Sequence, residues 1–142
     1  MSKNVPLSEN DVRVLDILQA QGRRSYADLG TDLGMAAPSV HERVKKLEAK
    51  GVIRGYAADV DPAAVGLLVL AFTWVTQAPG TISVDLTPEF AAIRDIEECH
   101  HIAGEADYLL KIRARDMEHL GEIVRRIQTT HDVFSTETDV VF

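Results

Sequence analysis

The sequence predicts an α+β fold in two parts: a helical unit over residues 1–60 and a β-α-β-β-α-β unit over residues 61–142. Three observations predict it. Apolar residues recur at helical spacing in the first part, whereas segments of the second part are apolar at alternate positions or throughout. The charge is also divided unequally, with a net of +1 in residues 1–60 and −8 in residues 61–142. This asymmetry indicates different partners for the two parts.

The composition is that of a folded protein in a reducing environment. The 142 residues are 46% hydrophobic, which is sufficient for buried cores. A single cysteine excludes an intramolecular disulfide framework and favours a cytoplasmic location. The first residues lack the apolar stretch of a secretory signal, and the apolar run Ala63–Val75 is shorter than the ~20 residues that span a membrane. We therefore expect neither secretion nor a membrane partner.

Two helices are predicted at the start of the N-terminal unit. The first, Ser8–Gln21, begins with a serine N-cap and has Asp11 three residues later, which is the spacing of a capping box. The second, Ser25–Leu33, also begins with a serine N-cap and carries an aspartate at the same spacing. Both segments have an apolar stripe at helical period, so both are expected to pack on a common core.

A third helix is predicted over Ala37–Gly51. Val40, Val44 and Leu47 lie at i, i+4 and i+7 and form one apolar face, while the opposite face is polar and basic. The final glycine stands where a helix ends at positive φ, and Val52 is placed to contact Leu47, as in a Schellman ending. The segment is therefore a short one-sided helix with a defined end.

The second and third helices are joined by the tight turn Gly34–Ala36, which is typical of a helix-turn-helix. The second helix of such a pair enters the DNA major groove with its N-terminal residues first. Val52–Val60 predicts a strand pair, or a strand with an extended tail, as a wing beside the helices. Polar residues at the helix start would meet base edges or backbone, and cations would neutralise phosphates. The predicted DNA-binding residues are Pro38, Ser39, Glu42, Arg43, Lys45, Lys46, Lys50 and Arg54.

A simpler explanation of these charges is that they form only a solvated helix face. The helix pair, the turn and the wing taken together favour DNA contact instead. Because the unit has a net charge of only +1, a single copy is expected to bind DNA weakly and in a salt-sensitive manner.

The C-terminal unit begins after the polar break Asp61-Pro62 with a strand predicted over Gly66–Gln77. Both faces of this strand are apolar, whereas a strand in a free antiparallel sheet should have one wet face. The chain has too few elements to cover both faces, so the pattern predicts a second subunit. The residues of the two faces are Leu68, Leu70, Phe72 and Trp74, and Leu67, Val69, Ala71 and Val75.

The remaining elements complete a ferredoxin-like order with an antiparallel sheet and two helices on one face. The other face is left free to pair with a partner. The second helix has Asp116 as N-cap, and its expected inward stripe is Met117, Leu120, Val124 and Ile127. The predicted elements are a helix over Thr87–Arg94, strands over Glu97–Ala103 and Asp107–Ala114, a helix to Gln128 and a strand over Val133–Phe142.

Two sets of landmarks follow one another along the chain. The N-terminal set is Leu15–Leu18, Gly22-Arg23, Leu29–Gly34 and Val40-x-x-Arg43-Val44-x-x-Leu47-Glu48-x-x-Gly51-Val52-Ile53-x-Gly55-Tyr56. The C-terminal set is Glu98–His100, Ala103–Lys111 and Thr136–Val141. In this order the two sets resemble the leucine-responsive and asparagine-operon regulators, the Lrp/AsnC or feast/famine family of transcription factors. The resemblance covers nearly the whole chain.

The resemblance implies a winged helix-turn-helix joined to an effector-sensing domain of the RAM type, which dimerises through its sheets. It implies double-stranded DNA as a partner, and a homodimer that assembles into tetramers or octamers. It also implies an amino acid or related metabolite, bound between subunits, as the effector; no cofactor is expected. The implied effector residues surround the Gly104–Asp107 turn and are completed across an interface. They are His101, Ile102, Gly104, Glu105, Asp107, Asp139, Val140 and Val141.

Two of these residues have a physical reason to contact an effector. Gly104 allows the backbone to approach a ligand, and Asp107 is suited to accept hydrogen bonds from an α-ammonium group. Alternatively, Asp107 satisfies the amides of its own turn. The chain departs from the common family pattern at Ala36, Glu105 and Asp139, so the identity of the ligand does not follow from the resemblance.

Three other functions are suggested by parts of the sequence. Cys99, His100 and His101 suggest a metal site, but alternation places only Cys99 and His101 on one face, which is too few ligands. A siroheme decarboxylase-like enzyme shares the architecture, yet its carboxylate-rich substrate favours a cationic pocket, unlike this acidic domain. A DNA-packaging protein with little sequence preference is the other alternative. We predict no catalytic residues and favour a regulator in which effector binding is linked to assembly and operator affinity.

Overall fold

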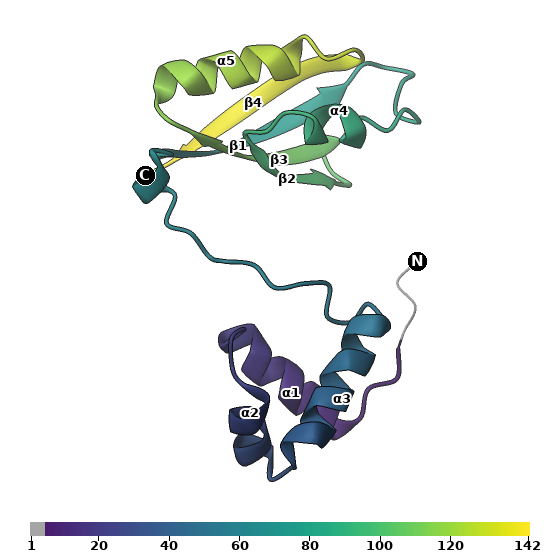
Figure 1. Ribbon diagram of the computed structural model, residues 1–142. Coiled ribbons are helices and arrows are strands. Elements are labelled where there is room, and N and C mark those ends of the chain that lie inside the picture. Colours follow the sequence, from purple (N-terminus) through teal and green to yellow (C-terminus); the bar gives the residue numbers. More distant parts are fainter. Residues whose placement is uncertain (1–4) are drawn as a thin grey trace. The chain divides into compact units, whose positions relative to one another are not determined.

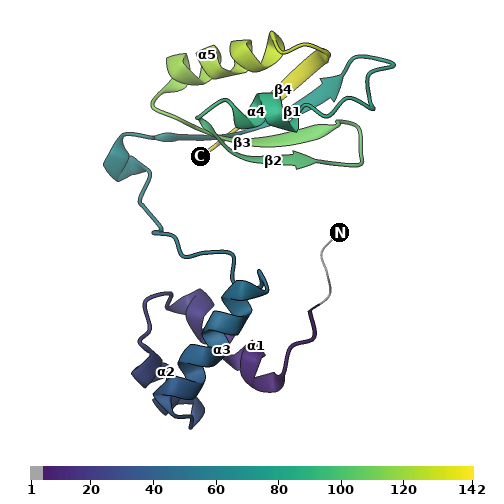
Figure 2. The ribbon, with the colours of Figure 1, turned by 45° about the vertical axis from the view of Figure 1, so that its right-hand side comes forward.

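The computed structural model describes residues 5–142 (Figures 1 and 2). The chain divides into two compact units between Asp59 and Val60, one residue before the expected boundary. Each unit has its own hydrophobic core. The first unit consists of helices α1, α2 and α3, and the second is a sheet that carries helices α4 and α5 (Figure 1). In the described residues, no helix is both long enough and apolar enough to cross a membrane.

The three helices of the first unit surround one small apolar core. Their bounds are Glu9–Ala20 for α1, Tyr26–Leu33 for α2 and Ala37–Ala49 for α3. The core is made of Val14, Leu29, Leu33, Val40, Val44 and Leu47. The three predicted helices and the predicted inward face of the third are therefore confirmed.

Local capping explains where the first two helices begin. The Ser8 hydroxyl accepts a hydrogen bond from the Asp11 N–H at 3.1 Å, and the Asp11 carboxylate accepts one from the Ser8 N–H at 2.8 Å. This reciprocal pair is the predicted capping box of α1. The Ser25 hydroxyl accepts from the Asp28 N–H at 3.0 Å and caps α2.

The third helix ends in the predicted Schellman motif. Gly51 lies at φ 72°, and its N–H donates to the Glu48 carbonyl at 2.9 Å. The Val52 N–H donates to the Leu47 carbonyl, also at 2.9 Å. Glycine has no Cβ, so it occupies this left-handed conformation without the usual steric cost.

The turn between α2 and α3 depends on a glycine inside α2. A Cβ on Gly30 would lie 2.5 Å from the Met35 carbonyl oxygen. The Met35 N–H in turn donates to the Gly30 carbonyl at 2.8 Å, so the turn is held directly against the helix. This close backbone approach sets the spacing of the helix-turn-helix, and the sequence analysis did not single out Gly30.

The strand expected within Val52–Val60 is absent. Residues 51–53 form turns and bends, and residues 54–60 are neither helix nor strand. A strand requires a neighbouring strand for its backbone groups, and residues 5–59 contain none. The segment is instead held by Tyr56, whose hydroxyl donates to the Glu48 carboxylate at 3.1 Å.

The second unit is a four-stranded antiparallel sheet with the order β2-β3-β1-β4. This is the predicted ferredoxin-like arrangement, and α4 and α5 lie on the same side of the sheet in both views (Figures 1 and 2). A short 3-10 helix, η1 (Ala63–Val65), precedes it. The bounds are Val69–Gln77 for β1, Thr87–Ala91 for α4, Ile96–His101 for β2, Tyr108–Ala114 for β3, Met117–Gln128 for α5 and Val133–Val141 for β4.

In the second unit, three boundaries differ from the predicted ones by two residues or more. The first strand begins at Val69 rather than Gly66, because η1 ends at Gly66 with φ 79° and the chain has not yet joined the sheet. Helix α4 ends at Ala91 rather than Arg94. Strand β2 ends at His101 rather than Ala103, because the Ile102 N–H donates to the Asp107 carbonyl at 2.8 Å and closes the turn.

The inward face of α5 was only partly predicted. Asp116 caps the helix as expected, by accepting from the His119 N–H at 2.7 Å. Met117, however, is 59% exposed, whereas His119 and Ile123 are buried. Leu120 and Ile127 are buried as predicted, whereas Val124 is only partly buried against the core and Ile123, one residue earlier, is buried in its place.

The two faces of the sheet differ in character. Ala71, Val75 and the alternate residues of β3 face the helices and are fully buried. Leu70, Phe72 and Trp74 alternate with them and lie on the face opposite the helices, where Trp74 is 36% exposed. We call this second surface the open face. Both faces are apolar along β1, as predicted.

Candidate functional site

The surface of α3 that points away from the core carries most of the predicted DNA-binding residues. Ion pairs on this surface join residues of the same helix: Lys46 and Glu42 at 3.1 Å, and Lys45 and Glu48 at 3.3 Å. Such exposed pairs contribute little to stability, so these side chains are available to a ligand. The predicted residues that lie exposed here or just beyond the helix are Pro38, Ser39, Glu42, Lys45, Lys46, Lys50 and Arg54.

The start of α3 has no side-chain cap. Ala36 is the N-cap residue and Pro38 lies within the first turn. Ser39 and Glu42 follow on the exposed surface, so the positive end of the helix dipole and two polar side chains face solvent together. A surface of this kind suits contact with a polyanion and with the edges of its bases.

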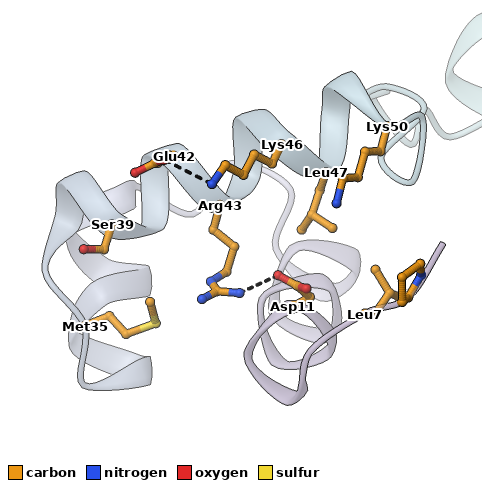
Figure 3. A pocket seen from close by; sticks show the side chains of 10 residues that line it. Leu7, Asp11, Met35, Ser39, Glu42, Arg43, Lys46, Leu47 and Lys50 are labelled. Atoms are coloured by element: carbon orange, nitrogen blue, oxygen red, sulfur yellow. Dashed lines mark hydrogen bonds and ion pairs between the residues drawn. The ribbon is translucent and has the colours of Figure 1, made fainter.

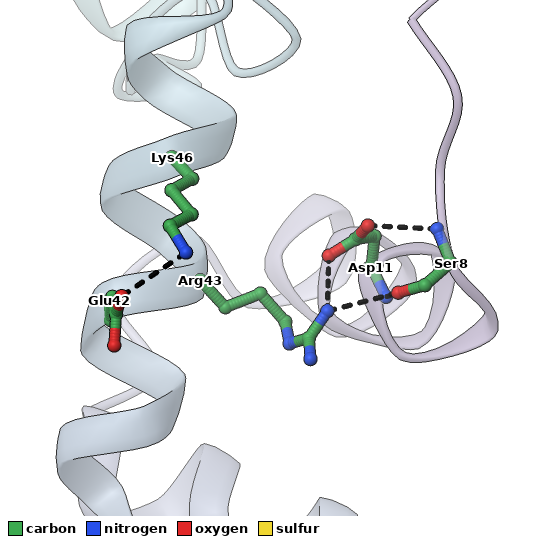
Figure 4. A network of polar contacts seen from close by, with 5 residues as sticks. All are labelled: Ser8, Asp11, Glu42, Arg43 and Lys46. Carbon is green, nitrogen blue, oxygen red and sulfur yellow. Dashed lines mark hydrogen bonds and ion pairs between the residues drawn. The ribbon is translucent and has the colours of Figure 1, made fainter.

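Arg43 is placed differently from the other predicted residues. Its guanidinium points from α3 toward α1 and donates to the Asp11 carboxylate at 2.6 Å and to the Ser8 hydroxyl at 2.9 Å (Figure 4). Partial burial opposes the charged form of Asp11, but the Ser8 amide and Arg43 outweigh it and hold its pKa below the ordinary value. Arg43 thus pairs within the protein, which its place in the sequence did not reveal.

A hollow of about 260 Å³ lies beside this pair (Figure 3). Arg43 and Asp11 point into it from opposite helices, and Lys46, Lys50 and Leu7 lie around them (Figure 3). The full lining is Pro6, Leu7, Asp11, Met35, Ser39, Glu42, Arg43, Lys46, Leu47 and Lys50.

The second unit has an open hollow of about 830 Å³ at the turn between β2 and β3. The turn is anchored by its last residue, because the Asp107 N–H donates to the Val75 carbonyl of β1 at 2.9 Å. Register places Glu137 opposite Trp74 and Ser135 opposite Thr76, so β1 and β4 supply adjacent parts of the wall. The lining residues are Trp74, Thr76, Ile102, Ala103, Gly104, Glu105, Ala106, Ser135, Thr136 and Glu137.

Three of the eight predicted effector residues line this hollow: Ile102, Gly104 and Glu105. His101 lies elsewhere, because its ring stacks on the Tyr108 ring with centroids 4.8 Å apart. The Asp107 carboxylate accepts a hydrogen bond from the Gln77 N–H at 2.7 Å. Within the chain, Asp107 therefore serves a backbone amide, but one of β1 rather than an amide of its own turn.

The segment Asp139–Val141 lies farther along β4, opposite Phe72, Ala71 and Leu70. The side chain of Val140 packs against the core on the helix-covered face. Asp139 accepts a hydrogen bond from the indole N–H of Trp74 at 3.0 Å, so it orients a residue that lines the hollow. Within one chain, the β4 residues beside the turn are Ser135–Glu137 instead.

Trp74, Thr76 and Glu137 also line this hollow and were not predicted from the sequence. Alternation along β1 and β4 placed these side chains on a common face, but only the register shows that they meet at the turn. Gly104 has no steric need for glycine in this chain, since a Cβ there would meet nothing within 4 Å. Its backbone is accordingly open to approach from the hollow.

Comparison with known proteins gives two family matches that together span most of the chain. Residues 70–142 match the Lrp/AsnC ligand binding domain, and residues 7–54 match a winged helix-turn-helix DNA-binding domain. The chain belongs to the Lrp/AsnC family. The resemblance drawn from the sequence is confirmed, as is the pairing of a DNA-binding unit with a ligand-binding unit.

Curated members of the Lrp/AsnC family are similar along nearly their whole length. The transcriptional regulator LrpA of Mycobacterium tuberculosis is 33% identical over 138 residues, which cover 97% of this chain and 92% of LrpA. The leucine-responsive regulatory protein of Haemophilus influenzae is 34% identical over 145 residues, which cover 98% of this chain and 86% of that protein.

Solved structures of Lrp/AsnC proteins have the same fold. The transcriptional regulator NMB0573 of Neisseria meningitidis, in a complex with L-Met, has a TM-score of 0.90 at 27% identity and covers 96% of this chain and 90% of its own. A feast or famine regulatory protein from M. tuberculosis, complexed with L-methionine, has a TM-score of 0.87 at 31% identity. It covers 96% of this chain and 92% of its own.

Cys99, His100 and His101 of this Lrp/AsnC protein suggested a metal site from the sequence. Within residues 5–142, no three His, Cys, Asp or Glu side chains are arranged to hold a metal ion. Cys99 and His101 share the helix-covered face, opposite Leu110 and Tyr108. Burial raises the pKa of the Cys99 thiol, which keeps it protonated at neutral pH.

Proposed function

We propose that this protein is a sequence-specific regulator of transcription that binds operator DNA through α3. The observation that carries the proposal is the exposed face of α3, which presents polar residues at its start and cations along its length in a helix-turn-helix. Ser39 and Glu42 are the residues for base edges, with Pro38 beside them. Lys45, Lys46, Lys50 and Arg54 are the residues for phosphates.

The protein acts as a homodimer or a higher oligomer, in this proposal. Leu70, Phe72 and Trp74 make the open face apolar, and water contact on such a surface is costly. The first unit has a net charge of only +1, so two copies at a set spacing are needed for firm operator binding. Pairing through the open face supplies that second copy, and dimers are proposed to assemble into tetramers or octamers.

The effector is proposed to be an amino acid or a related small metabolite that binds at the hollow beside the Gly104 turn. Two relatives of this fold have been crystallised with methionine. In this chain Glu105 and Glu137 offer carboxylates for an α-ammonium group, and the Trp74 ring offers an apolar surface for a side chain. Effector binding and assembly are linked, so each shifts the other.

No cofactor or catalytic group is part of this proposal. A siroheme decarboxylase-like enzyme of the same architecture would need cations for a carboxylate-rich substrate, whereas the hollow offers Glu105 and Glu137 and no lysine or arginine. We place the regulator in the cytoplasm, because its single cysteine favours a reducing environment and its partner is DNA.

Two measurements test the proposal. Fluorescence anisotropy compares binding to DNA from upstream of the protein's own coding region with binding to scrambled DNA of equal length. A clear preference is expected, whereas equal affinities would support a DNA-packaging protein.

A thermal-shift screen of the common amino acids, combined with light scattering, should find an effector that changes both stability and assembly. Tetrapyrrole absorbance of the purified protein would support the enzyme instead.

A further inference from the structure

Among the cations of α3 that form ion pairs, Arg43 has the least exposed side chain. Its side chain is 28% exposed, compared with 56% for Lys45 and 68% for Lys46. Its Nε atom is buried and has no hydrogen-bond partner among residues 5–142. Arg43 adjoins Val44 and lies between Val40 and Leu47 along the helix, so it sits at the edge of the face that packs on the core. The guanidinium is therefore directed into the protein rather than toward DNA.

The network around Arg43 joins two helices through a capping box. Asp11 accepts from the Ser8 N–H with one carboxylate oxygen and from Arg43 with the other, at 2.8 and 2.6 Å. The Ser8 hydroxyl accepts from both the Asp11 N–H and the Arg43 guanidinium, at 3.1 and 2.9 Å (Figure 4). By contrast, the Lys46–Glu42 pair in the same view stays within α3.

This network can set an angle that the apolar core cannot. Apolar contacts between Val14 of α1 and Val40 or Val44 of α3 are non-directional, whereas a guanidinium that donates to two acceptors has a defined direction. Ser39 and Glu42 project from the same helix as Arg43, four residues and one residue before it. A rotation of α3 against α1 would therefore move both of them relative to bases.

We propose that Arg43 is a positioning residue: together with Asp11 and Ser8 it sets the orientation of α3 on α1 and thereby the preference for operator DNA, without contacting DNA itself. The inference rests on the proposed operator-binding function. It distinguishes Arg43 from Lys46, which lies three residues later and is assigned to phosphate contact.

The decisive variant is Asp11→Asn, measured with the full-length chain on operator and scrambled DNA over a range of salt concentrations. It removes a negative charge from the DNA-binding unit, so electrostatics alone would strengthen binding to both DNAs. The positioning role requires the opposite for the operator: a loss of about tenfold or more in affinity, because a charged hydrogen bond is removed. Affinity for scrambled DNA should not fall. Operator binding equal to or tighter than that of the wild type would overturn the inference.

Two further variants keep the test independent of folding. Both hydrogen bonds of Arg43 leave from one terminal nitrogen, Nη1. Arg43→Lys retains the charge but carries its donor on a shorter stem without the planar guanidinium. It should reduce the ratio of operator to scrambled affinity while the salt slope stays unchanged, and a wild-type ratio would contradict the inference. Lys46→Met is the matched control, which should lower the salt slope by about 0.9 and keep the ratio. Thermal unfolding of each variant verifies that it is folded.

A double variant completes the design. If Arg43 acts through Asp11, combining Asp11→Asn with Arg43→Lys should give a ratio of operator to scrambled affinity close to that of the poorer single variant. Additive losses in this ratio would show that Arg43 acts through another partner. Failure of the proposed function is distinguishable, because the wild-type chain would then show no preference for the operator. If every variant retained the wild-type preference for operator DNA, the proposed function would be supported and the positioning role of Arg43 would be contradicted.

Discussion

At the residue scale, Lys45 and Lys46 extend from α3 into solvent. In the part of the chain that the structure describes, each forms an ion pair only with a carboxylate of its own helix. Glu42 is largely exposed, and Glu48 keeps its hydrogen bond from the Tyr56 hydroxyl when Lys45 leaves, so a DNA phosphate can replace either carboxylate at little cost. These two side chains are therefore the simplest test of how α3 meets the DNA backbone.

Replacing both Lys45 and Lys46 with alanine is expected to weaken DNA binding. The slope of log affinity against log salt should fall by up to about 1.8, since each phosphate contact contributes about 0.9. Anisotropy titrations at several salt concentrations measure the slope. The control is the double variant Arg125→Ala and Arg126→Ala on α5, which changes the net charge equally and should retain the slope. An unchanged slope in the lysine variant would place these side chains away from phosphates.

Asp107 illustrates how a polar residue in a turn can have a structural role. Its carboxylate accepts a hydrogen bond from the N–H of Gln77, a buried residue that is only 5% exposed. Asp107→Ala leaves that amide without its acceptor, so the free energy of unfolding should fall by about 1–3 kcal/mol. Urea unfolding followed by the fluorescence of Trp74, the single tryptophan, measures the loss. Full stability in this variant would contradict the role.

Glu137 provides the matched comparison for Asp107. It is exposed, lines the hollow and makes no hydrogen bond that Glu137→Gln would remove in the described residues. This variant should keep the wild-type stability and lose most of the thermal shift produced by the amino-acid effector, because the ammonium loses a charged acceptor. If the effector response persists in Glu137→Gln, the ammonium is bound elsewhere.

At the scale of elements, the spacing between α2 and α3 depends on the contact of Gly30 with the Met35 carbonyl. Gly30→Ala places a Cβ 2.5 Å from that backbone oxygen, so helix and turn must separate. We expect a loss of about 1–3 kcal/mol in unfolding free energy and weaker operator binding. Gly22→Ala is the control, because its Cβ would meet its nearest atom at an ordinary 3.6 Å. Equal behaviour of the two variants in urea unfolding would refute this role of Gly30.

The contact between α1 and α3 is expected to depend on pH through Asp11. Its pKa is lower than the ordinary 3.8: partial burial raises it, but the Ser8 amide and Arg43 lower it more. A carboxylate of this kind stabilises the folded state above its unfolded pKa, and the contribution disappears as pH falls through the folded pKa. The stability difference between wild type and Asp11→Asn should therefore be largest above the ordinary pKa of 3.8 and shrink as pH falls below it. Urea unfolding monitored by helical circular dichroism tests this, and a constant difference would exclude it.

At the scale of the whole molecule, the open face of the sheet is proposed to join two copies of the chain. Phe72→Glu places a charge in the centre of this surface and should convert the oligomer to a monomer that binds the operator poorly. Light scattering coupled to size exclusion measures the mass. Met117→Glu is the control, since Met117 is equally apolar, 59% exposed and on α5 instead of the open face. An unchanged mass in Phe72→Glu would show that assembly uses another surface.

Much of this architecture could be predicted from residues close together in the sequence. Ser8 and Asp11 predict the start of α1, and Leu47, Gly51 and Val52 predict the end of α3, because capping acts over three to five residues. The alternation of β1 predicted its two apolar faces for the same reason. Periods of 3.6 and 2 residues are local properties of the chain.

The sequence by itself therefore determined the helices, the strands, their order and the family to which the chain belongs. Only the tertiary structure decided that Arg43 faces Asp11, that residues 52–60 form no strand and that Glu137 rather than Asp139 reaches the Gly104 turn. The first and third of these features join residues that are more than thirty positions apart, such as Asp11 and Arg43 at a separation of 32. A helix face allows a side chain several directions, and a strand allows several registers; packing against distant elements selects one of them.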